Sequence, residues 1–324
     1  MNWHVEPYAV AFSRPLATAH GVWRRRRGFL VTVTDAEGRV GRGEAVPLPD
    51  WGTETALECL AYLRGPGPLR PDGHLPREGG GRPAAWAAIE QARLDLEAQT
   101  AGVPLAALLG VSLRSAIPVN ALVTGEIPPG YATYKLKLTG DLARDLPRVA
   151  AARAAIGNAA LRLDANGSWT ATEALHALEA LAPFDPEYVE QPTSLEGLAE
   201  VVKHGAVPVA ADECVRLDTL DRVLATGVRI LIVKPAALGG LRATQALLAR
   251  APGLKVVLTS ALDRGISTAG VLQLAATVMD LPACGLATAG LFDGGPLLPG
   301  LVPVAGAIAV PQGPGLWHPE PVRC

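Results

Sequence analysis

Two lysines stand one residue apart in a short apolar segment, residues 134–138 (YKLKL). Side chains alternate between the two faces of a β-strand, so Lys135 and Lys137 would point to the same side. Two ammonium groups buried side by side against apolar groups would cost a great deal of free energy. The pair therefore predicts that this face of the strand looks into a polar cavity.

Polar residues recur at regular intervals after Lys137. The steps are 27, 26, 22, 22 and 26 residues, and they lead to Asp164, Glu190, Asp212, Lys234 and Ser260. Each step is about one strand plus one helix. The carboxyl ends of the strands in a parallel barrel meet at one mouth, where active sites are built. We therefore expect these side chains to surround one site.

The three acids suggest a metal site. Asp164, Glu190 and Asp212 would come from consecutive strands and lie side by side, where their charges repel one another unless a divalent cation binds. Ligation by oxygen alone, without His or Cys, favours Mg²⁺ or Mn²⁺ over Zn²⁺.

The lysines suggest a base. Lys135 and a bound dication would both lower the pKa of Lys137 below its usual value of about 10.4. Lys137 and Lys234 would then flank the metal from opposite sides. This arrangement predicts removal of a proton from the carbon next to a carboxylate, with the metal stabilising the charge that develops.

The elements that must position these residues alternate between strand and helix from about residue 117. Strands are predicted within residues 117–125, 134–140, 161–167, 188–192, 207–213, 229–235, 255–262 and 283–289, separated by Ala- and Leu-rich helical segments such as 146–157. Alternation of this kind predicts parallel strands, and eight of them predict a closed α/β barrel.

The N-terminal third has a different, α+β pattern. Two strands within residues 29–49 are joined by a turn at 35–38, and helices are predicted from near Thr53 and from Pro83. Proline is suited to the first turn of a helix because its missing N–H would have no partner there.

The composition excludes several classes of protein. The chain has 324 residues, 49% of them apolar, a formal net charge of −2 and a pI of about 6.3. Nothing in this balance indicates a nucleic-acid or membrane partner. The four cysteines are scattered and the N-terminus lacks a signal-peptide pattern, so we expect a cytoplasmic protein. The lysines and acids described above predict that its substrate is a small carboxylate. Its oligomeric state stays open.

Five short motifs occur in a fixed order: KLK at 135–137, LDANGSW at 163–169, VEQP at 189–192, ADE at 211–213 and VKP at 233–235. This set resembles the muconate-lactonizing subgroup of the enolase superfamily. The N-terminal patterns GRGEAVPLP and AAIEQARLDLEAQTAGVPLAALLG resemble the capping domain of that family. The resemblance implies a modified (β/α)7β TIM-type barrel at 111–299 and a capping domain at 1–110, to which a tail at about 300–324 returns.

Within the subgroup the chain is most similar to the o-succinylbenzoate synthase family, through RRRRGFLVTV, GEAVPLPDWGTET, LTSALDRGISTAG and ACGLATAGLF. This similarity implies a hydro-lyase of menaquinone biosynthesis that performs the syn-dehydration of SHCHC (2-succinyl-6-hydroxy-2,4-cyclohexadiene-1-carboxylate). Lys137 would serve as base and then as acid, and Lys234 would stabilise the intermediate by a cation–π contact. Mg²⁺ on Asp164, Glu190 and Asp212 would hold the enediolate.

The family also implies residues around this centre. Ser260 and main-chain N–H groups near Gly285 and Thr288 would bind the substrate carboxylate, although Ser260 could instead satisfy main-chain groups alone. From their positions in the sequence, we expect Asn166 to cap the following turn rather than bind the metal, although it lies close to it. We expect Glu213 to support the ligands or form a salt bridge rather than act as a fourth ligand.

The resemblance also implies a mobile loop at about residues 16–27 that closes over the substrate. The arginine run 24–27 within it is typical of a solvated face, with attraction of a dicarboxylate as the alternative. Trp51 and Trp169 are expected near the mouth of the barrel.

Other functions fit the same lysines. N-acylamino acid racemases and dipeptide epimerases need a lysine on each face of the carbon, and muconate cycloisomerisation is a further alternative. The epimerases resemble one another in an acidic pair near the last strand, whereas residues 285–295 here contain one acid, Asp293. A non-catalytic barrel that serves as a binding module would predict a broken catalytic set, and here the set is complete.

Overall fold

The first unit of the chain is an antiparallel sheet with strand order β1-β2-β3, seen in a computed structural model that describes residues 2–18, 21–65, 81–298 and 300–317. Its strands are β1 (Asn2–Thr18), β2 (Gly21–Thr34) and β3 (Val40–Ala45). The predicted turn at 35–38 joins β2 to β3, and Asp35 Oδ1 stabilises it by accepting the Glu37 and Arg39 N–H groups.

Three helices come next: α1 (Ala56–Arg64), α2 (Pro83–Ala101) and α3 (Leu105–Leu109). Helix α2 begins at Pro83, as predicted, and packs its Trp86 and Ile89 against Phe29 and Val31 of the sheet. The approach is close because β3 carries glycine: a Cβ at Gly43 would lie 1.9 Å from the Ala88 carbonyl oxygen.

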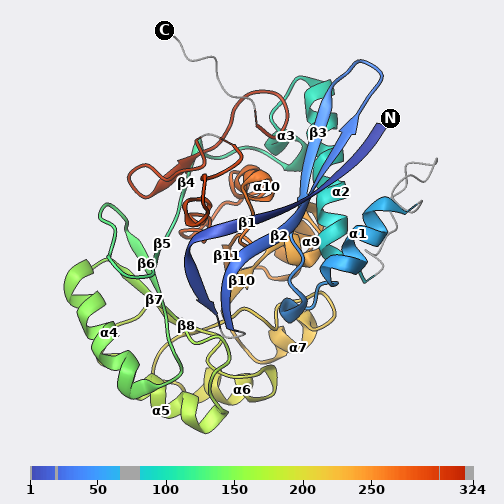
Figure 1. The fold of residues 1–324 in the computed structure, drawn as a ribbon. Helices are drawn as coiled ribbons and strands as arrows, with labels where there is room; N and C mark the ends of the chain where they lie inside the picture. The colour runs from blue at the N-terminus through green and yellow to red at the C-terminus, as the bar shows by residue number, and fades with distance from the viewer. Residues whose placement is uncertain (1, 19–20, 66–80, 299, 318–324) are drawn as a thin grey trace.

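Seven parallel strands form the barrel, in the order β5 to β11 (Figure 1). They are β5 (Ala121–Val123), β6 (Thr133–Lys137), β7 (Ala160–Asp164), β8 (Tyr188–Glu190), β9 (Val209–Ala211), β10 (Ile230–Val233) and β11 (Lys255–Leu258). The sheet and the N-terminal α+β unit confirm the predicted fold class.

The eighth predicted strand, 283–289, is not a strand. Its start forms two isolated parallel bridges, Val119 with Cys284 and Thr259 with Gly285, and these close the barrel between β11 and β5. The segment cannot continue the ladder because it turns into the 3-10 helix η4 (Ala289–Leu291) within a few residues.

Helices cover the outside of the barrel (Figure 1): α4 (Leu142–Ile156), α5 (Ala171–Leu181), α6 (Leu195–His204), α7 (Leu220–Ala225), α8 (Pro235–Leu238), α9 (Leu241–Arg250) and α10 (Ile266–Ala275). Two further 3-10 turns are η1 (Pro49–Trp51) and η3 (Ala182–Phe184). Helix α4 begins four residues before the predicted start at 146, because Asp141 caps it and Pro147 lies inside it.

The C-terminal segment packs against earlier parts of the chain. Strand β12 (Ala307–Ala309) pairs antiparallel with β4 (Ala116–Pro118), and the Leu316 N–H donates to Asp95 on α2 at 2.7 Å. Residues 318–324 of the predicted tail lie outside the described residues. The division into a cap at 1–110 and a barrel at 111–299 stays a prediction. In the described ranges no helix has both the length and the apolar composition needed to cross a bilayer.

Buried glutamates fasten the α+β unit to the barrel helices. Glu44 of β3 accepts the Arg264 and Ser267 N–H groups at the start of α10, and Glu90 of α2 accepts the N–H of Arg242 at the start of α9, at 3.2 Å. The N-terminus of a helix attracts an anion through its unpaired N–H groups and its dipole. Burial nevertheless raises the pKa of both carboxyl groups to about 7.

This burial predicts a pH-dependent contribution from Glu90. Its pKa is about 7 in the folded protein against 4.5 in the unfolded chain, so the folded state binds more protons between these pH values. The free energy of unfolding should therefore fall as the pH rises through this range, by about 3 kcal/mol from this group. The Glu90→Gln variant should lack that fall in urea unfolding at pH 4 and pH 8. Equal pH dependence in the two proteins would contradict the assignment.

Candidate active site

The strand register brings the predicted residues to one mouth. Lys137, Asp164 and Glu190 are neighbours across β6, β7 and β8. Asp212 and Lys234 directly follow β9 and β10. Strands β6 and β10 are separated by three strands in the sheet. In the other direction they are separated by β11, residues 283–289 (the closing segment) and β5; we call the two bridges of the closing segment the seam. Lysines at their ends therefore face each other across the mouth.

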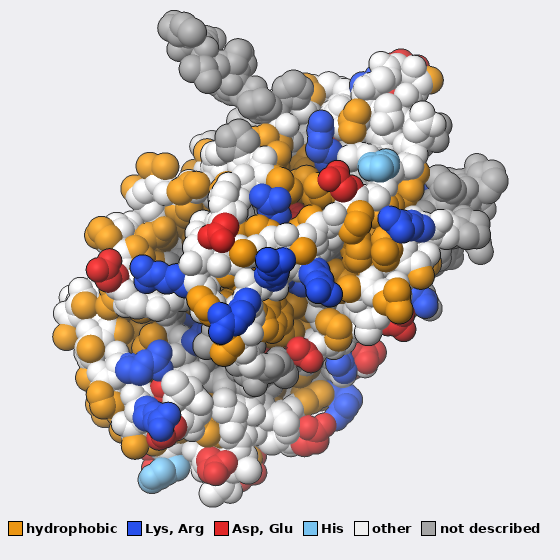
Figure 2. All heavy atoms as spheres, in the orientation of Figure 1, with side chains coloured by type: hydrophobic (Ala, Val, Ile, Leu, Met, Phe, Trp, Pro, Cys, Tyr) orange, Lys and Arg blue, Asp and Glu red, His pale blue; other side chains and the backbone are white. Residues whose placement is uncertain are grey.

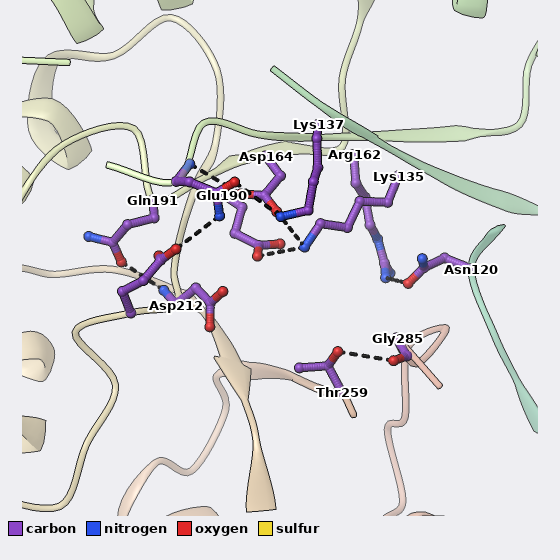
Figure 3. A network of polar contacts seen from close by, with 12 residues as sticks. Asn120, Lys135, Lys137, Arg162, Asp164, Glu190, Gln191, Asp212, Thr259 and Gly285 are labelled. Atoms are coloured by element: carbon purple, nitrogen blue, oxygen red, sulfur yellow. Dashed lines mark hydrogen bonds and ion pairs between the residues drawn. The ribbon is translucent and has the colours of Figure 1, made fainter. Parts of the chain in front are cut away.

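The lysine pair lies against carboxylates rather than apolar groups (Figure 3). Lys135 Nζ is 2.7 Å from Glu190 Oε1 and 2.9 Å from Asp164 Oδ2. Lys137 Nζ is 3.5 Å from the same Asp164 oxygen. On the other side Lys234 forms an ion pair with Asp212. The alternation of strand side chains thus delivers both lysines to the polar face that the sequence predicted.

The two predicted supporting residues form a chain of hydrogen bonds that begins at Lys137. Asn166 Oδ1 accepts from Lys137 Nζ at 3.1 Å, and Asn166 Nδ2 donates to Glu213 Oε1 at 2.9 Å. The Asn166 side chain therefore orients Lys137, and the cap of the next helix is Thr170. Asn166 has φ of 48°, a conformation that few non-glycine residues adopt. Such strain at a strand end is a common feature of functional sites.

The two carboxylates that share Lys135 have different electrostatic environments. Burial raises the pKa of Asp164, but Lys135 and Lys137 outweigh it and lower the value to about 2. Glu190 contacts a single ammonium group, so burial and the charge of Asp164 hold its pKa well above the usual range. Burial lowers the pKa of Lys135, yet the neighbouring carboxylates keep it well above its ordinary value. Lys135 is therefore a constant positive charge beside Lys137.

The donor set fits a divalent cation. Four carboxyl groups, those of Asp164, Glu190, Asp212 and Glu213, lie beside only three ammonium groups, and Glu213 Oε2 is buried without a hydrogen-bond partner. In the described part of the chain no three of these acids already stand close enough together to hold an ion; lysine ammonium groups pair with Asp164, Glu190 and Asp212 instead. An oxygen-only set of ligands matches Mg²⁺ or Mn²⁺.

A cavity of about 770 Å³, including its open mouth, lies over this network. Lys135, Lys137, Asp164, Asp212 and Lys234 line its polar end, whereas Glu190 lies behind Lys135 and does not line it. The other walls are mostly apolar and include Leu16, Trp23, Leu48, Trp51, Leu122, Ala261, Leu262 and Ala287.

The N-terminal hairpin supplies part of this wall, and Figure 1 shows it crossing the barrel. Residues 16–27, predicted as a loop, are instead the ends of β1 and β2, apart from residues 19–20, which lie outside the described residues. The Trp51 ring lies 5.3 Å from Lys234 Nζ, as expected for a residue at the mouth. Trp169 is buried in the barrel core and donates to the Gly140 carbonyl, so its role is packing.

The predicted carboxylate-binding residues line the side near the seam. Ser260 Oγ and Thr288 Oγ1 are 2.6 Å apart, and both residues line the cavity with Gly285. The Gly285 N–H donates to the Leu258 carbonyl, however, so it is not free for a substrate. Its importance is steric, because a Cβ there would lie 2.4 Å from Thr259 Oγ1.

Sequence reasoning missed Arg162, which fills the barrel beneath the site. It is 1% exposed and donates to Glu187 and to the Ala283 carbonyl, both at 2.7 Å, with its guanidinium 5.2 Å from the Tyr188 ring. The signal that could have found it is its place two residues before Asp164, on the same strand face. Asn120 and Thr259 also line the cavity and carry no motif.

The seam gives a stability prediction. The Gly285→Ala variant should lose about 1–3 kcal/mol, because the new methyl group forces Thr259 to move. Gly290→Ala is the matched control, since nothing lies within 4 Å of a Cβ there. Urea unfolding of both variants is the measurement, and equal effects would show that the close contact is unimportant.

Comparison with known proteins gives the same picture. Residues 121–316 match the family described as "Enolase C-terminal domain-like". Over 317 residues the chain is 32% identical to an o-succinylbenzoate synthase from Thermobifida fusca (strain YX), and the match covers 93% of this chain and 86% of the relative.

Solved structures share the whole fold. A muconate lactonizing enzyme from Pseudomonas fluorescens, complexed with muconolactone, has a TM-score of 0.85 at 25% identity and covers 97% of this chain and 95% of its own. A dipeptide epimerase from Enterococcus faecalis V583, complexed with Mg and L-Leu-L-Tyr, has a TM-score of 0.82 at 25% identity and covers 97% and 98%.

The chain therefore belongs to the enolase superfamily, as an enzyme with that family's barrel and N-terminal α+β unit. Within it, the chain falls in the muconate-lactonizing subgroup, and it is similar to an o-succinylbenzoate synthase.

Proposed function

We propose that this enzyme is an o-succinylbenzoate synthase, which dehydrates SHCHC to 2-succinylbenzoate in menaquinone biosynthesis. One observation carries the proposal: the cavity has a single charged end, and its remaining walls are mostly apolar. A carboxylate attached to a carbocycle matches this division, and the similarity to the Thermobifida fusca synthase supports it.

Lys137 is the proposed proton-transfer residue. As a free amine it takes the proton alpha to the substrate carboxylate, and the C–H bonding pair becomes part of the new ring double bond. Hydroxide leaves with the electrons of the C–O bond and takes the same proton back from the Lys137 ammonium, which yields water and the free amine. Asn166 fixes the direction of this side chain. Positioned acid–base groups of this kind contribute about 10²–10⁴-fold to rates.

The other residues hold charge. Lys234 lies on the opposite side of the mouth. We propose that its ammonium group makes a cation–π contact with the face of the substrate ring that points away from Lys137. Asp164, Glu190 and Asp212 are the proposed ligands of Mg²⁺ or Mn²⁺. When bound, that ion would supply electrostatic stabilisation of the negative charge that develops on the substrate carboxylate. Ser260 and Thr288 are proposed to bind the substrate, and Glu213 to orient Asn166.

Racemisation or epimerisation on the same lysines is the second candidate, supported by the similarity in fold to the dipeptide epimerase. A dipeptide carries an ammonium group that needs a counter-charge. Among the described residues, however, the acids that line the cavity are Asp164 and Asp212, both engaged by lysines. This distribution favours the synthase.

Purified protein with Mg²⁺ should consume SHCHC, followed by its loss of absorbance, and EDTA should stop the reaction. The Lys137→Ala variant should lose at least about 10³-fold in kcat with its circular dichroism spectrum unchanged. Full activity in that variant would refute the mechanism. A wild-type protein that does not convert SHCHC but exchanges the alpha proton of N-acylamino acids in D₂O would favour the second candidate.

Metal binding can be tested without substrate. Calorimetric titration with Mg²⁺ should show affinity weakened on the order of 100-fold in Asp212→Asn, because one ligand charge is lost. Asp293→Asn is the matched control, since Asp293 is an exposed acid that does not line the cavity. Equal affinities in the Asp212 variant and the wild type would remove Asp212 from the ligand set.

A further inference from the structure

One arginine of the run 24–27 is buried. Arg24, Arg25 and Arg27 are exposed, as the sequence predicted, whereas Arg26 is 6% exposed. Figure 2 shows a cluster of basic side chains on the face that the β1–β2 hairpin crosses, but Arg26 does not belong to this solvated group.

The Arg26 guanidinium uses all five of its N–H donors on main-chain carbonyl oxygens. Nε donates to Leu262 at 3.2 Å. One Nη donates to Arg27 at 3.2 Å and to Pro47 at 2.9 Å, and the other to Val46 at 2.9 Å and to Ala261 at 3.2 Å. No other side chain has five donors in a rigid planar fork.

Four of these carbonyls lie on segments that build two walls of the cavity. Val46 and Pro47 lead into Leu48 of the N-terminal unit, and Ala261 and Leu262 follow strand β11; Leu48, Ala261 and Leu262 line the cavity. The guanidinium therefore joins the wall built by the N-terminal unit to the wall built by the barrel.

The barrel wall needs such support. Leu262 has φ of 57°, which is unusual for a bulky side chain. Its carbonyl is held by Arg26 and its N–H by Ser260 Oγ at 3.4 Å. The same contacts therefore hold the strained residue and the proposed substrate-binding hydroxyl in place.

We propose that Arg26 is a positioning residue for the substrate: its guanidinium fixes the wall of Ser260, Ala261 and Leu262 against the N-terminal unit and so sets the shape of the cavity opposite the catalytic lysines. The proposal rests on the proposed function in that this cavity takes the substrate. Arg26 contacts none of the lysines or carboxylates of the polar end, so its effect is on substrate placement and not on proton transfer.

The surrounding charges make lysine the informative replacement. The Glu44 carboxylate accepts hydrogen bonds from the Tyr8 hydroxyl and from the N–H groups of Arg264 and Ser267. Asp263 Oδ1 accepts one from the Thr268 N–H in the first turn of α10. A cation at position 26 balances these buried acids. Arg26→Lys keeps that charge and loses the planar fork, so it isolates the geometry.

In Arg26→Lys the KM for SHCHC should rise at least about 10-fold while kcat stays within about threefold, because misplaced walls weaken binding more than chemistry. Arg25→Lys, an exposed neighbour, should change neither constant. Gln91→Met weakens another contact between the N-terminal unit and the barrel, the bond to the Ile266 carbonyl, and should lower the melting temperature without raising KM.

Hydrogen exchange provides a readout that needs no substrate. In the wild type the amides of Leu262 and Arg264 should be protected, and Arg26→Lys should speed their exchange at least about 10-fold relative to the α2 amides. Unprotected amides in the wild type, an unchanged KM in Arg26→Lys, or an equal KM rise in Gln91→Met would each overturn the proposal. Failure of the wild type to convert SHCHC would refute the proposed function while leaving the exchange result to judge the role of Arg26.

Discussion

The structure depends on a balance of buried charge at one end of the barrel. Ions removed from water are tolerated only when opposite charges and hydrogen bonds replace the lost hydration. Asp164 is 1% exposed and Glu190 equally so, and Lys135 lies within 3 Å of both. Each partner therefore offsets the cost of burying the other. The contacts require β6, β7 and β8 to lie in this order and register.

Below this charged layer the barrel is filled by apolar groups and one cation. Tyr188, Ala210, Ile230, Ile232 and Val257 form a closed interior cluster. Arg162 completes it by joining Glu187 and the carbonyl of Ala283, so it also holds the segment that closes the barrel. The floor of the site is therefore packed side chains of the barrel, whereas loops and the N-terminal unit supply its walls.

Local periodicity accounts for the site residues that could be predicted from the sequence. Lys135, Lys137, Asp164 and their successors were found because strand alternation and the length of a βα unit both leave a regular trace in the chain. The buried cations could not be recognised in that way. Arg26 looks like its exposed neighbours, and its burial depends on carbonyls that lie up to 236 residues away.

The same distinction explains the errors in secondary structure. Helix α4 starts earlier than the Ala- and Leu-rich segment that predicted it, because the deciding feature is the Asp141 side chain that caps the helix. Residues 283–289 have the composition of a strand, but strand formation depends on whether neighbours on both sides continue the ladder. Here Thr259, just after β11, and Val119, just before β5, form one bridge each with it.

The closing segment makes one side of the barrel differ from the others in how it is hydrogen-bonded. Seven strands are joined by continuous ladders, whereas the eighth side is fastened by two bridges, the Arg162 contact and the hydroxyl of Thr259. The main-chain hydrogen bonds of Cys284 and Gly285 hold this side closed, so the wall there depends on a few local contacts. Thr288 and Ala287 lie just beyond these contacts and line the cavity, so the distance from this wall to the lysines is set by two residues of the closing segment rather than by a full strand.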